Sequence, residues 1–320
     1  MIQVFYGGGV IDILVILAVA LAIDLVLGEP PRVMHPVVWI GKVALFLGKG
    51  GIGGRRWAQF VYGCGTTLLT MGLFVAPAYF LLLYLKGINF WLYVIVAAAL
   101  LKYTFSLKEL RQAALGVKVL LLKDKLDEAR FELRSLVSRD TRGLPQPLLV
   151  SATVESVAEN SCDSFVAPLF YFLLLGVPGA IAYRVVNTLD AMVGYHGEYE
   201  YLGKFASRLD DVLNFVPARL TALLLVLATF LSRKDTRSSW QVMLSDHANT
   251  ESPNAGWPMA AVAGALNVQL EKVGHYKLGR ANAHLIPETV DAALKLVLIA
   301  MLSWVIICFI VGVSCFAITT

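Results

Sequence analysis

The sequence is short of charge. Only 16% of its 320 residues are Asp, Glu, Lys or Arg, whereas 58% are hydrophobic and the mean hydropathy is +0.69. Soluble globular domains carry about a quarter charged residues, so the deficit argues against a soluble protein. The net charge of +4 is small and spread out, which argues against a nucleic-acid partner. The composition favours a single bundle partly buried in membrane lipid.

Paired cysteines and a basic N terminus are also lacking. The four cysteines stand at 64, 162, 308 and 315, without the CxxC spacing of a zinc or disulfide site. We expect them to pack as small apolar side chains. No Lys or Arg precedes Arg32, so the basic region of a cleaved signal peptide is missing. The first apolar stretch is therefore expected to remain in the mature protein.

Long uncharged runs are abundant. A membrane-spanning helix needs roughly 20 apolar residues. The first run carries Asp12 and Asp24, which must face protein, water or the interface. Four segments are expected to span the membrane: 10–27, 57–85, 88–101 and 296–318.

Two further apolar segments are ambiguous. Residues 164–183 contain Gly176 and Pro178, and residues 212–232 contain Pro217 and Arg219. Broken helices at membrane depth are tolerated where they line a protein-enclosed cavity. Either both segments cross the membrane, or both dip in and return.

Basic residues predict the orientation. Ten Lys or Arg lie in 102–142, whereas the turn between the second and third spans has only Lys86. Because basic loops stay in the cytoplasm, residues 28–56, 102–163 and 233–291 are expected there. Apolar residues spaced by three and four over 103–140 indicate soluble helices, and strand signals are weak. The predicted fold is all-α: a polytopic membrane bundle with cytoplasmic helical segments and re-entrant or broken helices.

Polar residues gather in stretches that a membrane bundle does not need. At the end of the first span, Glu29, Arg32 and His35 cluster around two prolines. A capped helix end explains them, but Arg32 and His35 could also bind an anionic ligand, since Arg forks onto phosphate or carboxylate.

A second stretch is acidic. If it is helical, Glu155, Glu159 and Asp163 share one face at spacings of four, and no basic residue stands at a matching spacing. Like charges so placed repel, unless an ion such as Mg²⁺, which binds carboxylates and nucleotide phosphates, neutralises them. A solvated acidic face is the alternative. Asp163 directly precedes an apolar run, which favours the metal.

Two more stretches are candidates for ligand binding. The third joins residues at helical spacing to a set of acids, with tyrosines that either anchor the interface or stack on a planar ligand. Its candidate residues are Arg184, Asn187, Asp190, Tyr195, Arg208, Asp210 and Asp211. The fourth, 246–258, has the polar density of a binding loop. N-capping by Ser252 or Asn254 explains part of it, but not Asp246 and His247.

Phosphate-loop, GxSxG and HExxH motifs are absent from the sequence. The residues alone therefore indicate a membrane protein with a cytoplasmic, acid-rich polar site that uses magnesium.

Six strings, in chain order over nearly the whole sequence, resemble the adenosylcobinamide-phosphate synthase family, the CbiB/CobD-type cobalamin biosynthesis proteins. They are Gly-Glu-Pro-Pro-Arg with His-Pro (28–36), Ser-Arg-Asp-Thr (138–141), Ala-Thr-Val-Glu-Ser-Val-Ala-Glu-Asn with Asp (152–163), Tyr-Arg with Asn-Thr-Leu-Asp-Ala-Met-Val-Gly (183–194), Arg-Leu-Asp-Asp with Asn and Pro-Ala-Arg-Leu (208–220) and Ser-Pro-Asn-Ala-Gly (252–256). Met259, Glu271 and Lys272 depart from the pattern of the family.

The resemblance implies a ligase of the inner membrane, with its site facing the cytoplasm. Adenosylcobyric acid would be joined to (R)-1-amino-2-propanol or its O-phosphate with ATP and Mg²⁺, next to membrane lipid and possible partner enzymes of cobalamin assembly. The acidic face would hold Mg²⁺ on the nucleotide, and Arg139, next to Asp140, would offset charge on the transferring phosphoryl group. Asp246 and His247 are candidate bases for the amine.

Three other functions are also compatible with the sequence. Asp-rich faces also occur in intramembrane, magnesium-dependent prenyltransferases. Broken helices also form the binding sites of transporters, here for a small anion or a corrinoid. A structural subunit that recruits soluble enzymes would not need so many carboxylates near the membrane.

Overall fold

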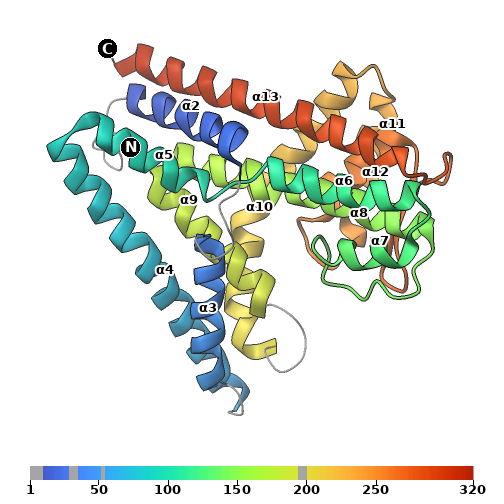
Figure 1. The fold of residues 1–320 in the computed structure, drawn as a ribbon, viewed down its shortest axis with the longest axis horizontal. Coiled ribbons are helices and arrows are strands. Elements are labelled where there is room, and N and C mark those ends of the chain that lie inside the picture. Colours follow the sequence, from blue (N-terminus) through green and yellow to red (C-terminus); the bar gives the residue numbers. More distant parts are fainter. Residues whose placement is uncertain (1–9, 29–34, 52–54, 194–199, 320) are drawn as a thin grey trace. The chain divides into compact units, whose positions relative to one another are not determined.

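The computed structural model describes residues 10–28, 35–51, 55–193 and 200–319. The chain divides into two compact units. Unit 1 comprises residues 1–106, 167–213 and 308–320, and unit 2 comprises residues 107–166 and 214–307. Two long helices, α10 (Glu200–Leu231) and α13 (Glu288–Thr319), contribute to both units (Figure 1).

Unit 1 is a set of apolar helices. Besides its parts of α10 and α13, it contains α2 (Val10–Leu27), α3 (Pro36–Gly48), η2 (Lys49–Gly51), α4 (Arg56–Ile88), α5 (Phe90–Lys102) and α9 (Ala167–Val193). A core of small and branched side chains joins α3 and α9 to the start of α10, through Ile40, Ala44, Val185, Leu189 and Ala206. This packing positions the polar side of α9.

The two acids of α2 are both paired. Lys86 of α4 lies 3.3 Å from Asp12, and Lys102 of α5 lies 3.0 Å from Asp24. The second pair is almost fully buried, with the two side chains 3% and 2% exposed. A buried charge without a partner is very costly, so these pairs explain how an apolar helix retains two aspartates.

Four helical segments are long and apolar enough to cross a membrane: Arg56–Ile88, Gln146–Met192, Glu200–Leu231 and Glu288–Ser314. Two of them overlap the expected spans 57–85 and 296–318, which therefore have the length and composition of spanning helices. The expected span 88–101 forms the shorter apolar helix α5, and 10–27 forms α2, which is not among the four candidates in the described residues. The protein is therefore an all-α membrane protein.

The two ambiguous segments differ in structure. In α9 the helix breaks at Gly176, whose φ of 74° and ψ of −167° are not helical, and Pro178 follows. The predicted break is thus confirmed. In contrast, α10 continues without interruption through Pro217.

Unit 2 contains the soluble helices. The expected pair is present as α6 (Lys108–Leu122) and α7 (Leu126–Leu133), joined at Asp124 with a φ of 56°. Then come α8 (Gln146–Ser161) and the π-helical turn η3 (Cys162–Val166). The remaining helices are α11 (Thr236–Asp246), η4 (His247–Asn249) and α12 (Gly256–Leu266).

A two-stranded antiparallel hairpin completes unit 2, contrary to the expected lack of strands. It pairs β1 (Gln269–Lys272) with β2 (Tyr276–Gly279), and Leu270 lies opposite Leu278. Both leucines are fully buried, and β1 packs against α8. Each strand has only four residues, which is too short for an alternating pattern to be recognised.

Candidate functional site

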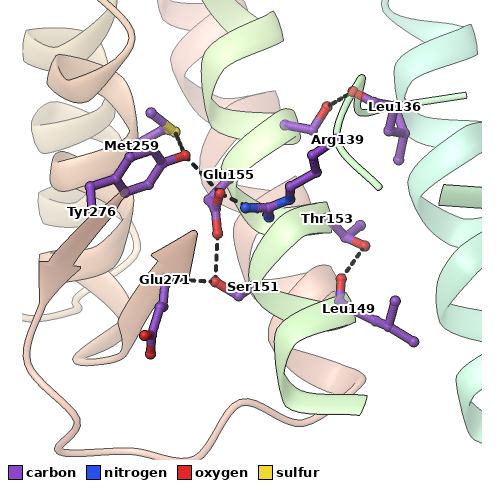
Figure 2. A network of polar contacts seen from close by, with 10 residues as sticks. Leu136, Arg139, Leu149, Ser151, Thr153, Glu155, Met259, Glu271 and Tyr276 are labelled. Carbon is purple, nitrogen blue, oxygen red and sulfur yellow. Dashed lines mark hydrogen bonds and ion pairs between the residues drawn. The ribbon is translucent and has the colours of Figure 1, made fainter. Parts of the chain in front are cut away.

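A network of polar contacts in unit 2 centres on Glu155 of α8 (Figure 2). Its Oε2 accepts hydrogen bonds from Arg139 Nη2 at 3.0 Å and from the Tyr276 hydroxyl at 2.8 Å. Its Oε1 accepts one from the Ser151 hydroxyl at 2.6 Å, and Ser151 Oγ in turn accepts from the backbone N–H of Glu271 at 2.8 Å. The carboxylate is only 4% exposed. It therefore ties the loop before α8 to the β-hairpin.

The network also fixes the protonation of Tyr276. Burial, followed by the charge of Glu155 and the hydrogen bond to it, raises the pKa of Tyr276 well above its usual value. A tyrosine with a raised pKa keeps its proton and donates a hydrogen bond to the carboxylate. Tyr276 is therefore a structural donor at neutral pH and not a base.

The expected acidic magnesium face is not formed as drawn from the sequence. Among the described residues, no group of three His, Cys, Asp or Glu could hold a metal ion. No basic residue stands at a matching spacing on the helix, but Arg139 supplies a partner for Glu155 from the loop before α8. Asp163 lies in η3, where i→i+5 bonding widens the turn. It therefore does not keep the straight helical register with Glu155 and Glu159.

The loop that carries Arg139 and Asp140 is held rigidly. Thr141 donates to the carbonyl of Arg130 at 2.8 Å, and Arg130 donates to the carbonyl of Leu144 at 2.9 and 3.1 Å. Asp140 binds Arg142 through both oxygens. This pairing lowers the pKa of Asp140 to about 2. Asp140 is thus ionised near neutral pH, with both oxygens bound to Arg142.

His247 follows α11 directly. Its Nδ1 lies 3.1 Å from the carbonyl oxygens of Met243 and Leu244. Carbonyls only accept, so Nδ1 carries the hydrogen and a neutral ring keeps Nε2 free to take a proton. The ring packs on Trp257, with centroids 3.9 Å apart.

Asp246 is engaged differently. Its Oδ2 accepts from the backbone N–H of Gly279 at 2.7 Å, and its Oδ1 accepts from the Ser245 hydroxyl at 2.5 Å. The contact with Gly279 anchors the end of α11 to the end of β2. Of the two predicted bases, His247 has the geometry of one, whereas Asp246 acts as an anchor.

The loop before α12 supports this region. Ser252 Oγ accepts from the backbone N–H groups of Asn254 and Ala255 in the turn before α12. The N-cap of α12 is Ala255, without a side-chain hydrogen bond, so the expected capping by Ser252 or Asn254 is not formed. Asn254 is buried, and its Oδ1 accepts from Arg219 Nη1 at 3.3 Å. The Arg219 guanidinium lies over the rings of Trp257 and Phe215. The loop thus holds a cation beside the imidazole stack.

A second polar cluster lies in unit 1, between α9 and α10. Arg184 Nη1 lies 3.3 Å from Asn187 Oδ1, and Asn187 Nδ2 donates to Asp210 Oδ1 at 3.4 Å. Asp190 is hydrogen-bonded to Ser207. Asn187 and Asp190 thus face α10, and Arg184 contacts Asn187 three residues along α9.

The remaining predicted site residues have other places. Arg208 is exposed and lies 3.7 Å from Asp211. His35 caps the start of α3 by accepting the backbone N–H of Val37. Glu29, Arg32 and Tyr195 lie outside the described residues.

Two residues of the network, Ser151 and Tyr276, were not expected from the sequence, and Lys272 was noted there only as a departure from the family pattern. Ser151 and Tyr276 bind Glu155 directly. Lys272, with Arg139, lines a cavity in unit 2. No signal marked Ser151 or Tyr276, because a serine on an apolar helix and a tyrosine on a four-residue strand carry no motif.

Comparison with known proteins agrees with this picture. The family described as CobD/Cbib protein matches residues 17–315. The protein named cobalamin biosynthesis protein CobD from Dehalococcoides mccartyi is 56% identical over 96% of this chain and 99% of its own length. Proteins named "Probable cobalamin biosynthesis protein CobD" are 43% identical over 82% of this chain and 86% of their own in Methanothermobacter thermautotrophicus, and 38% identical over 83% and 88% in Methanocaldococcus jannaschii. No solved structure matches. The chain belongs to the CobD/CbiB family of cobalamin biosynthesis proteins.

Proposed function

We propose that the chain catalyses an ATP-dependent ligation in cobalamin biosynthesis. It would join the free carboxylate of adenosylcobyric acid to (R)-1-amino-2-propanol or its O-phosphate, at the cytoplasmic side of the cell membrane. The observation that carries the proposal is the 56% identity to a CobD protein over 96% of the chain.

The reaction makes two demands on the protein. A carboxylate is a poor electrophile, so it is first phosphorylated by ATP, which yields an acyl phosphate and ADP. The amine nitrogen then attacks the carbonyl carbon, the C–N bond forms, and the C–O bond to phosphate breaks. The attacking amine must first lose a proton to a base.

His247 suits the role of that base. Its Nδ1 is bound to two backbone carbonyls and its ring is fixed on Trp257, so Nε2 is oriented to take the amine proton. Arg139 and Arg219 are the cations available in unit 2 to offset negative charge on the carboxyl and phosphoryl groups.

Magnesium accompanies ATP in this proposal. However, the described residues do not fit a three-carboxylate site for the ion, because Glu155 is already bound by Arg139, Ser151 and Tyr276. No step is therefore assigned to a protein-bound ion.

A direct assay tests the proposal. Purified protein in detergent is given adenosylcobyric acid, aminopropanol or its phosphate, ATP and Mg²⁺, and the corrinoids are analysed by mass spectrometry. We expect a product heavier by the amine minus water, formed only with ATP. Turnover of an isoprenoid diphosphate without ATP, or corrinoid uptake by sealed vesicles without product, would contradict it.

A further inference from the structure

The cavity of unit 2 lies beside the Glu155 network but is not explained by it. It has a volume of about 250 Å³. Its lining combines the loop before α8 with the β-hairpin: Arg139, Asp140, Leu144, Leu148, Glu271, Lys272, Val273 and His275. Pockets for drug-sized ligands span roughly 300–1,000 Å³. This cavity is therefore too small for a corrinoid or a whole nucleotide.

The acidic groups that line the cavity are each paired with a cation, which leaves positive charge in the lining without a counter-charge. The negative charge of Asp140 is offset by Arg142, and that of Glu271 by Lys277 at 3.2 Å. His275 is paired with Glu251 outside the lining.

Two cationic groups still have capacity for a ligand. Arg139 is neutralised by Glu155, yet its buried Nε has no hydrogen-bond partner among the described residues. Lys272 forms no ion pair with any residue in the part of the chain that the structure describes. An uncompensated ammonium beside a guanidinium with a spare donor attracts an oxyanion, and the pair suits phosphate best.

The apolar part of the lining further restricts which ligands can fit the cavity. Leu144, Leu148 and Val273 form a wall that would pack against a short carbon chain. We propose that this cavity binds the phosphate group of a small phosphate ester, held by Lys272 and Arg139. The ester is either a soluble metabolite or the head group of a membrane phospholipid, which share this chemistry. His247 and Arg219 do not line this cavity, and phosphate binding is measured without ATP or a corrinoid, so failure of this proposal is distinguishable from failure of the proposed ligation.

Calorimetry tests the site. Full-length protein in a phosphate-free maltoside detergent is titrated with inorganic phosphate and with ethyl phosphate. Lys272→Gln should weaken binding about tenfold or more, as expected for a lost charge-assisted contact. Lys234→Gln removes the same charge from an exposed lysine outside the lining and should leave the affinity unchanged.

A third variant acts in the opposite direction. Glu271→Gln removes a negative charge from the lining, so it should tighten phosphate binding several-fold, which misfolding could not imitate. Equal affinity of the wild type and Lys272→Gln would overturn the proposal.

The two sources of phosphate are separated by lipid analysis. Soluble phosphate that binds in detergent identifies a soluble ester. If it does not bind, phospholipid that co-purifies with the wild type but not with Lys272→Gln identifies a head group. If neither ligand depends on Lys272, the cavity is not a phosphate site.

Discussion

At the scale of single residues, Glu155 shows how far a sequence pattern can mislead. Three carboxylates at spacings of four suggested a metal ligand set, but Glu155 is the centre of a buried pair with Arg139. The partner comes from 16 residues earlier, across a turn that no periodicity describes. The sequence shows the charges along one helix, but it does not show that Arg139 reaches Glu155 from another part of the chain.

This pairing leads to a stability prediction. Glu155→Gln leaves the mostly buried Arg139 without its carboxylate, so the free energy of unfolding should fall by about 3 kcal/mol. Arg139→Gln should cost a similar amount, and the double variant less than the sum. Unfolding by SDS in mixed micelles measures all three. Additive losses, together with a raised Mg²⁺ requirement of Glu155→Gln, would instead favour the metal interpretation.

His247 gives a prediction about rate. If its Nε2 takes the proton of the amine, His247→Ala should lower the ligation rate by about 10²–10⁴-fold, and added imidazole should restore part of the activity. Asp246→Asn, which changes the anchor to Gly279, should mainly lower the apparent melting temperature. Full activity of His247→Ala would exclude this base.

Two departures from the family pattern turn out to lie in the same region. Met259 Sδ is 3.9 Å from the Tyr276 hydroxyl, and Lys272 lines the cavity. The sequence could mark these positions as unusual. It could not say that they meet, because the hairpin that joins them to α8 was not foreseen.

At the scale of elements, glycine and proline were the most reliable signals. Gly176 and Pro178 marked the break in α9, and the spacing of leucines and alanines marked α6 and α7. Proline alone was less informative, since α10 runs straight through Pro217. A proline in a long apolar helix can be tolerated when neighbouring groups satisfy the carbonyl four residues before it. The Tyr171 hydroxyl does so here by donating to the carbonyl of Leu213 at 2.8 Å.

The break in α9 should be sensitive to a single methyl group. Gly176 has a φ of 74° and a ψ of −167°, a region that is essentially restricted to glycine. Gly176→Ala should therefore cost about 1–3 kcal/mol and lower the apparent melting temperature in detergent. Gly72→Ala is the matched control, because a methyl group there meets open space. An equal effect of both variants would show that the break is not strained.

At the scale of the whole molecule, the distribution of basic residues predicts which segments face the cytoplasm. With the native cysteines replaced by alanine, single cysteines at Lys123 and Arg237 should react with a membrane-impermeant reagent only after the cells are permeabilised. Both positions lie in described parts of unit 2. Labelling in intact cells would reverse the predicted orientation.

The distribution of basic residues cannot decide whether 164–183 and 212–232 cross the membrane. If neither segment crosses, every other segment stays on the same side as when both cross. Composition and length allow both to span. The cost of intramembrane charge bears on the question. An arginine facing lipid costs a few kcal/mol at least, and Arg219 instead donates to the carbonyl of Phe215 and to Asn254. It therefore faces protein.

We therefore expect that the two segments do not both cross as ordinary helices. Because ATP and corrinoid intermediates are cytoplasmic, Arg184, Asn187 and Asp210 must face the cytoplasm if they bind substrate. Of the two, α9 is the one that is broken, and α10, at 32 residues, is longer than a single crossing requires. A cysteine at Glu200, probed from each face of oriented vesicles, should react from the cytoplasmic face. Reaction from the outer face alone would separate these residues from the substrates and assign the cluster of unit 1 a different role.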